Sequence, residues 1–146
     1  MRRTALIAAV LAALTAGRAA AAQPSAPPPD QSVTLAAVAL PLVFDGQIAN
    51  YVFVSTKLLL TPQADATALR DKEPYFRDAL VRAGHRTPFV RPNDYNHLDE
   101  ARLKATLYRE ATAIVGPGKI QGVVVLSETP QHRIATQRPA ALEIVP

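Results

Sequence analysis

The fold depends on residues 33–60, VTLAAVALPLVFDGQIANYVFVSTKLLL, where two apolar runs flank Asp45-Gly46. An Asp-Gly pair between two apolar runs is a strong signal for a tight hairpin turn, because both residues tolerate positive φ angles. Apolar side chains at alternate positions of the second run share one face, together with Thr56: Val52, Val54, Leu58 and Leu60. The stretch therefore predicts an antiparallel hairpin whose second strand is half-buried. Pro41 predicts an edge position or a bulge in the first strand, since proline has no N–H to donate.

Tyr51 and Phe53 lie on the opposite face of the second strand, because side chains alternate along a strand. Aromatic side chains there predict either a second buried face or an exposed contact patch. The sequence leaves both alternatives open.

Residues 64–86 have the apolar spacing of an amphipathic helix. One helical face carries the apolar residues Leu69, Phe76, Leu80 and Ala83. Pro74 lies inside the stretch, so that the helix either kinks there or begins there with Pro74 in its first turn. Gly84 predicts a frayed C-terminal end.

Residues 100–115 predict a second helix, with Asp99 as its N-cap. Its apolar face consists of Leu103, Leu107, Ala111 and Ile114. Glycine and proline at residues 116–118 stop the helix. Residues 119–129 then form a strand, in which the unbroken apolar run at 123–126 is typical of a central strand covered on both faces.

The predicted order is strand, strand, helix, helix, strand. It indicates an α+β fold: a small, mainly antiparallel sheet, built of the hairpin and a C-terminal strand, with two helices on one face.

Residues 1–22 have the composition of a signal peptide, with Arg2-Arg3, an apolar run, and alanines at positions 20 and 22 for cleavage. They predict a periplasmic protein exported by the general secretion route. The alternative is an uncleaved anchor in the inner membrane that faces the periplasm, and membrane contact is expected only in that case. Residues 23–32 form a proline-rich spacer.

A single α+β domain is expected at residues 33–130, followed by an extended tail at 131–146 in which residues 141–145 could form a short edge strand. His132, Arg133 and Arg138 in this tail either contact an acidic partner or are solvated.

The composition excludes several classes of function. The 146 residues include no cysteine, which excludes a disulfide scaffold, a thiolate zinc site and a cysteine nucleophile. The net charge of +4 comes from 16 basic and 12 acidic residues, but three of the arginines lie in residues 1–22, which contain no acid. The rest of the chain is nearly neutral, which argues against nucleic-acid binding.

Two histidines and three acids lie close together in the sequence: His85, Asp94, His97, Asp99 and Glu100. They lack the histidine spacing of a helical zinc site, and a loop that ends in an Asp N-cap accounts for them. No metal, cofactor or catalytic residue is therefore predicted, and an enzyme that uses His85 and His97 remains an alternative. Ser32, Ser55 and Ser127 lack the context of a nucleophile elbow. Residues 116–119, GPGK, follow a helix and precede a strand, whereas a phosphate loop follows a strand and precedes a helix.

The motif at residues 74–80, PYFRDAL, follows an extended apolar strand and precedes a loop, a leucine-bearing helix and a final apolar strand. In this order, residues 51–129 resemble the periplasmic domain of the flagellar basal-body-associated FliL family. The resemblance implies a stomatin-like, non-catalytic domain that associates with itself, often in rings, and contacts the flagellar stator or basal body. Family members usually carry a transmembrane anchor, whereas the leader here looks cleavable.

The sequence thus predicts an exported protein-interaction module that binds protein partners, including its own copies, through a sheet edge or a helix face. Self-association would cover an open sheet edge. A periplasmic small-ligand-binding protein, with a pocket between the helices and the sheet, is the alternative.

Overall fold

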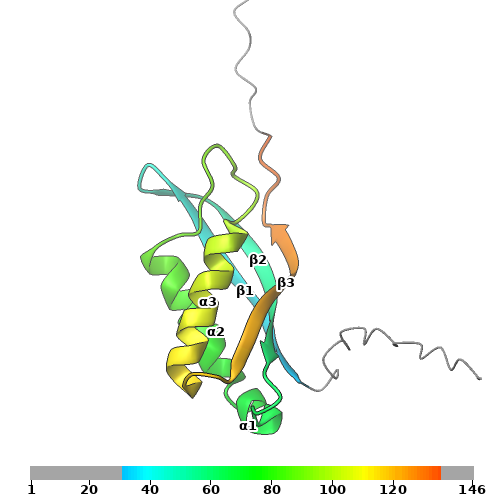
Figure 1. Cartoon of the computed structure of the whole chain (residues 1–146). Helices are drawn as coiled ribbons and strands as arrows, with labels where there is room; N and C mark the ends of the chain where they lie inside the picture. The colour runs from blue at the N-terminus through cyan, green and yellow to red at the C-terminus, as the bar shows by residue number, and fades with distance from the viewer. Residues whose placement is uncertain (1–30, 136–146) are drawn as a thin grey trace, which may run out of the picture.

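A hairpin of two long strands forms one side of the sheet in the computed structural model, which describes residues 31–135 (Figure 1). Strand β1 (Ser32–Phe44) pairs with β2 (Gln47–Leu60) in antiparallel register, and Phe44 faces Gln47 across the turn. Asp45 and Gly46 have φ angles of 51° and 76°, as a primed two-residue turn requires. The predicted hairpin is confirmed.

Several predictions fall beyond the described part of the chain. The signal peptide at residues 1–22, the spacer up to residue 30, the edge strand at 141–145 and Arg138 lie outside the described residues.

Strand β3 (Ile120–Pro130) pairs antiparallel with β2, so that the strand order is β1-β2-β3. The prediction that this strand is central is therefore wrong, because β3 lies at an edge and its outward side chains are exposed. Val123 and Val125 pack against the core, whereas Val124 and Leu126 are exposed. An unbroken apolar run shows that both faces of the strand carry apolar side chains. It does not show that other segments of the chain cover both faces. β1 is the other edge strand, as Pro41 predicted.

The helices follow the predicted spacing closely. A short helix, α1 (Ala66–Arg70), is separate from α2 (Glu73–Arg86), which carries Pro74 in its first turn. The main helix thus begins at Glu73, with Pro74 as its second residue, rather than kinking at the proline. Helix α3 (Glu100–Val115) has the predicted bounds, and the Asp99 side chain accepts a hydrogen bond from the Arg102 N–H. None of the helices between residues 31 and 135 is long and apolar enough to cross a membrane.

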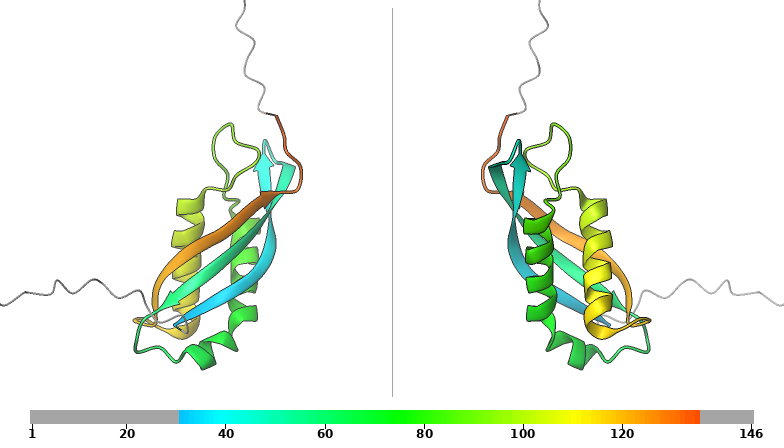
Figure 2. Two further views of the ribbon diagram at one scale, coloured as in Figure 1. Left: turned by 90° about the vertical axis from the view of Figure 1, so that its right-hand side faces the viewer. Right: turned by 90° about the vertical axis from the view of Figure 1, so that its left-hand side faces the viewer.

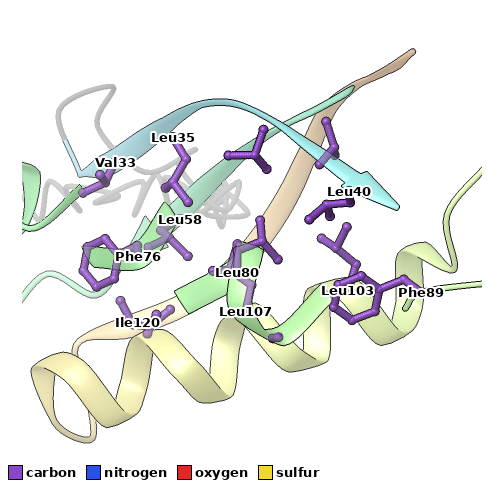
Figure 3. Close-up of a cluster of buried hydrophobic side chains, with 14 of the residues drawn as sticks. Val33, Leu35, Leu40, Leu58, Phe76, Leu80, Phe89, Leu103, Leu107 and Ile120 are labelled. Carbon is purple, nitrogen blue, oxygen red and sulfur yellow. The ribbon is translucent and has the colours of Figure 1, made fainter. Parts of the chain in front are cut away.

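Helices α2 and α3 lie side by side on one face of the sheet (Figure 2). Between them and the sheet lies a single core, part of which is shown in Figure 3. Its largest fully buried side chains come from every layer: Phe76 and Leu80 of α2, Leu103 and Leu107 of α3, and Leu35, Leu40, Leu42, Leu58 and Leu60 of the hairpin. The predicted α+β arrangement, with two helices on one face of an antiparallel sheet, is confirmed.

Gly84 marks a close approach of α2 to β1 rather than a frayed end. The residue is buried, and the helix continues to Arg86. A Cβ atom at this position would lie 2.9 Å from Cδ2 of Leu40 and 3.4 Å from Cε2 of Phe89. The missing side chain lets the helix pack directly on the hairpin.

Candidate interaction surface

One face of the sheet carries no helix in the described part of the chain (Figure 2). We call it the bare face. The large side chains exposed on it include Phe53, Val124 and Leu126, which are 46%, 36% and 48% exposed. The register places Phe53 beside Ala39 and Thr129, and it places Val124 beside Lys57. Exposed apolar side chains therefore lie on β2 and β3 on the side away from the core, with the pair Ser55 and Ser127 between Phe53 and Val124.

The bare face is almost uncharged. The strand register between residues 32 and 130 places a single charged side chain on it, that of Lys57. On β1 the register adds Thr34, beside Lys57, and Ala39, beside Phe53, to this face. Of the two alternatives for the aromatic pair, the second buried face is wrong: Phe53 is exposed and Tyr51 is half-buried. A solvated sheet face normally alternates with polar residues, so an apolar one indicates a contact surface.

The two edges of the sheet differ. At β1 the Glu73 carboxylate accepts a hydrogen bond of 2.9 Å from the Ala36 N–H, and the register shifts between Leu35 and Val38. Charged side chains, bulges and prolines at an edge oppose pairing with another chain. At β3, no hydrogen bond from another described segment reaches the outer edge. Two register shifts interrupt β3 as well, but residues 122–125 pair with β2 in unbroken register between them.

Asn50 fixes the chain that follows β3. It is a polar residue in the core, only 3% exposed. Its Nδ2 donates hydrogen bonds of 2.9 Å and 2.7 Å to the carbonyls of Tyr95 and His132, and its Oδ1 accepts from the N–H groups of Tyr51 and His132. Every hydrogen bond that this amide makes is to the main chain, so it joins the hairpin, the loop before α3 and the C-terminal segment.

Asn96 makes a second connection to that segment. Its Nδ2 donates to the Ile134 carbonyl and its Oδ1 accepts from the Ile134 N–H, both at 2.8 Å. Residues 131–135, the start of the predicted tail, are thereby held against the loop, while the side chains of His132 and Arg133 are exposed. No pattern in the sequence indicates the role of either asparagine, since nothing links residues 50 and 96 to residues so far along the chain.

The candidate metal cluster is a loop motif in the structure. The Asp94 carboxylate accepts hydrogen bonds from the N–H groups of Asn96 and His97, and it lies 3.1 Å from Nδ1 of the His97 ring. Partial burial, the largest single influence, acts to raise the pKa of Asp94. The hydrogen bonds from Asn96 and His97 and the charge of His97 together outweigh it, so the pKa lies below its ordinary value.

The remaining members of that cluster have separate partners. The His85 ring lies 2.8 Å from the Val81 carbonyl of its own helix, and Glu100 forms an ion pair with Lys104. Between residues 31 and 135, no three histidines or acids meet in an arrangement that could hold a metal ion. The structure therefore does not assemble His85 and His97 into one site.

The other candidate motifs have structural roles. Gly116 has a φ angle of 90° and donates its N–H to the Thr112 carbonyl, so that residues 116–118 end α3 as predicted. Ser55 and Ser127 face each other across β2 and β3, and Ser32 begins β1.

No model of a known protein family matches the chain, and no curated protein matches it either.

Proposed function

We propose that this chain is an exported, non-catalytic interaction module that binds a second copy of itself through the bare face. The exposed apolar side chains of Phe53, Val124 and Leu126 carry the proposal. Burying apolar side chains is favourable by about 25 cal/mol per Å² of surface removed from water. Exposed apolar side chains on two adjacent strands, with small uncharged serine and threonine side chains among them, offer an area for such burial.

A second copy is the occupant that the composition of the face favours. A strongly charged partner would need complementary charges, and the strands present Lys57 alone. A patch that lies on a two-fold axis contacts its own copy with the same residues, so an apolar patch is automatically complementary to itself. In the proposed dimer two bare faces pack against each other, about 10 Å apart, with the helices outermost.

The resemblance of residues 51–129 to the FliL family supports the same proposal. Domains of that family associate with themselves and contact the flagellar stator. We extend the proposal accordingly to a periplasmic role beside the flagellar stator or basal body. The stomatin-like architecture and the protein's place in the cell stay predictions of the resemblance and of residues 1–22.

The oligomeric state of the purified protein tests the self-association. Light scattering after size-exclusion chromatography, over a range of concentrations, is expected to show a concentration-dependent dimer. Leu126→Glu is expected to give a monomer that still unfolds cooperatively, because Leu126 is outside the core, and its melting temperature is expected to lose the concentration dependence that dimer formation gives the wild type. Tyr75→Glu is the matched control, since Tyr75 is an exposed aromatic residue on α2. A wild-type protein that stays monomeric at all concentrations would reject the proposal.

A pull-down from the native cell envelope tests the flagellar role. Cross-linked wild-type protein is expected to recover stator or basal-body proteins, and mass spectrometry of the same sample defines the mature N-terminus. If dimers form without any flagellar partner, the self-association stands and the flagellar role is rejected.

A further inference from the structure

A groove of about 500 Å³ opens between the C-terminal part of α2 and the middle of α3. Ala83 and Ala105 line it from the two helices, and Phe89, which is 2% exposed, closes its base. Small side chains on facing helices leave this space unfilled. The groove belongs to the helical layer, whereas the bare face lies on the other side of the sheet.

Three arginines and one acid line the same groove. Arg86 comes from α2, and Arg102 and Arg109 come from α3. Glu110 is the single acid among the lining residues, and its Oε1 lies 3.9 Å from Nη2 of Arg86 and 3.4 Å from Nη2 of Arg109. Among the described residues, Arg102 forms no ion pair. The groove therefore has an excess of two positive charges.

Other arginines of the domain are paired differently. Each of three has a carboxylate three or four residues away in the sequence: Arg77 with Glu73, Arg82 with Asp78 and Arg91 with Asp94. Each pair places a carboxylate beside its arginine, and Asp94 also contacts His97. The three arginines of the groove come from two helices, and Glu110 is the single carboxylate that the groove offers them.

We infer that this groove binds a small oxyanion ligand, a phosphate ester or carboxylate that carries an apolar group. Guanidinium groups donate paired hydrogen bonds to phosphate and carboxylate oxygens, which makes arginine the usual residue for such ligands. The volume lies within the range of small-molecule sites, about 300–1,000 Å³. Ala105, with the small accessible parts of Ala83 and Phe89, supplies the contact for the apolar group, and the arginines supply the contact for the oxyanion.

Calorimetric titration of the purified protein with phenyl phosphate tests the inference, with inorganic phosphate as the probe that lacks the apolar group. Phenyl phosphate is expected to bind more tightly than inorganic phosphate. Arg102→Gln is expected to weaken binding about tenfold, because it removes a charge-assisted hydrogen bond. Glu110→Gln is expected to tighten binding severalfold, because it frees Arg86 and Arg109 from their shared carboxylate.

Lys104→Gln and Glu100→Gln are the matched controls. They change the net charge by the same amounts on the same helix, but they alter an ion pair outside the groove. Equal effects of the groove and control variants would show unspecific attraction and overturn the inference. So would the absence of phenyl phosphate binding at millimolar concentration and low salt.

Vesicles distinguish a free ligand from a lipid headgroup. Binding to phosphatidylglycerol vesicles, but neither to phosphatidylcholine vesicles nor to phenyl phosphate, would overturn the small-ligand assignment. Leu126→Glu is expected to leave phenyl phosphate binding unchanged, so the groove and the proposed dimer are tested independently.

Discussion

The carboxylate of Glu73, in the first turn of α2, accepts a hydrogen bond of 2.9 Å from the main-chain N–H of Ala36 on β1. Ala36 lies within the register shift between Leu35 and Val38, where β1 bulges out of its pairing with β2. The helix thus satisfies an edge amide that the sheet leaves unpaired. Glu128 of β3 does not protect an edge amide in this way. Its carboxylate accepts a hydrogen bond from the N–H of Leu98, on the side of the sheet where the helices lie.

Glu73→Ala is expected to destabilise the domain by about 1 kcal/mol, since a hydrogen bond with a charged partner is lost at a position open to water. Hydrogen exchange of the Ala36 amide is expected to become faster. Asp78→Ala is the control, because Asp78 pairs with Arg82 on the same helix and contacts no strand amide. Unchanged protection of Ala36 in Glu73→Ala would contradict the role assigned to this contact.

Leu107→Asp is expected to abolish cooperative unfolding. Leu107 is fully buried, and a carboxylate there would be an unpaired charge in the core. Tyr108→Asp places the same charge at the next, exposed position of α3, and a near-native melting temperature is expected. Circular dichroism during heating distinguishes the two results. A Leu107→Asp protein that melts like the wild type would mean that α3 has a different register.

Gly84→Ala is expected to destabilise the protein by about 1–2 kcal/mol, as overpacked core substitutions do. In an open helix the same change would stabilise by up to about 1 kcal/mol. The difference arises because the new methyl group would lie 2.9 Å from Leu40 Cδ2, and Leu40 is itself fully buried.

A double-mutant cycle with Leu40→Ala tests this cause. Removing the leucine side chain is expected to eliminate most of the penalty of Gly84→Ala, measured by urea denaturation. Additive effects of the two changes would show that the penalty arises elsewhere.

Asp94→Asn tests the loop before α3 through its pH dependence. The pKa of Asp94 is lowered in the folded protein, so its ionised form stabilises the fold at pH values above the unfolded pKa of about 3.9. That stabilisation is lost as the pH falls through the folded pKa. The wild type is therefore expected to melt above Asp94→Asn at pH 7, with the difference closing in acid. Asp78→Asn, an exposed carboxylate paired on α2, serves as the control. A difference that is constant with pH would contradict the assignment.

Local signals in the sequence predict most of the fold. The Asp45-Gly46 turn, the Asp99 N-cap and the Gly116 stop depend on neighbouring residues, and all three are confirmed. Alternation along β2 also identifies the buried face correctly, from Val52 to Leu60. Each of these features is set within a few residues of chain.

The errors concern relations between distant segments. The run at residues 123–126 shows that both faces of β3 are apolar, but which strand it pairs with depends on the whole sheet. Gly84 resembles a helix end locally, and only the position of Leu40 reveals it as a packing contact. Tyr51 and Phe53 indicate in the sequence that the bare face carries aromatic side chains. The alternation of residues along the strand does not show whether a second layer covers them.

The β1 edge of the sheet is obstructed and the β3 edge is open, and this difference limits how the protein can polymerise. Fibril growth by strand addition needs two open edges on every subunit, one to receive a neighbour and one to offer the next. Glu73, the bulge beside Ala36 and Pro41 obstruct this on β1. Addition at β3 alone would end with two molecules whose sheets are joined edge to edge, because the β1 edge of each molecule is obstructed. The domain can therefore keep the β3 edge open at high local concentration without growing a fibril by strand addition.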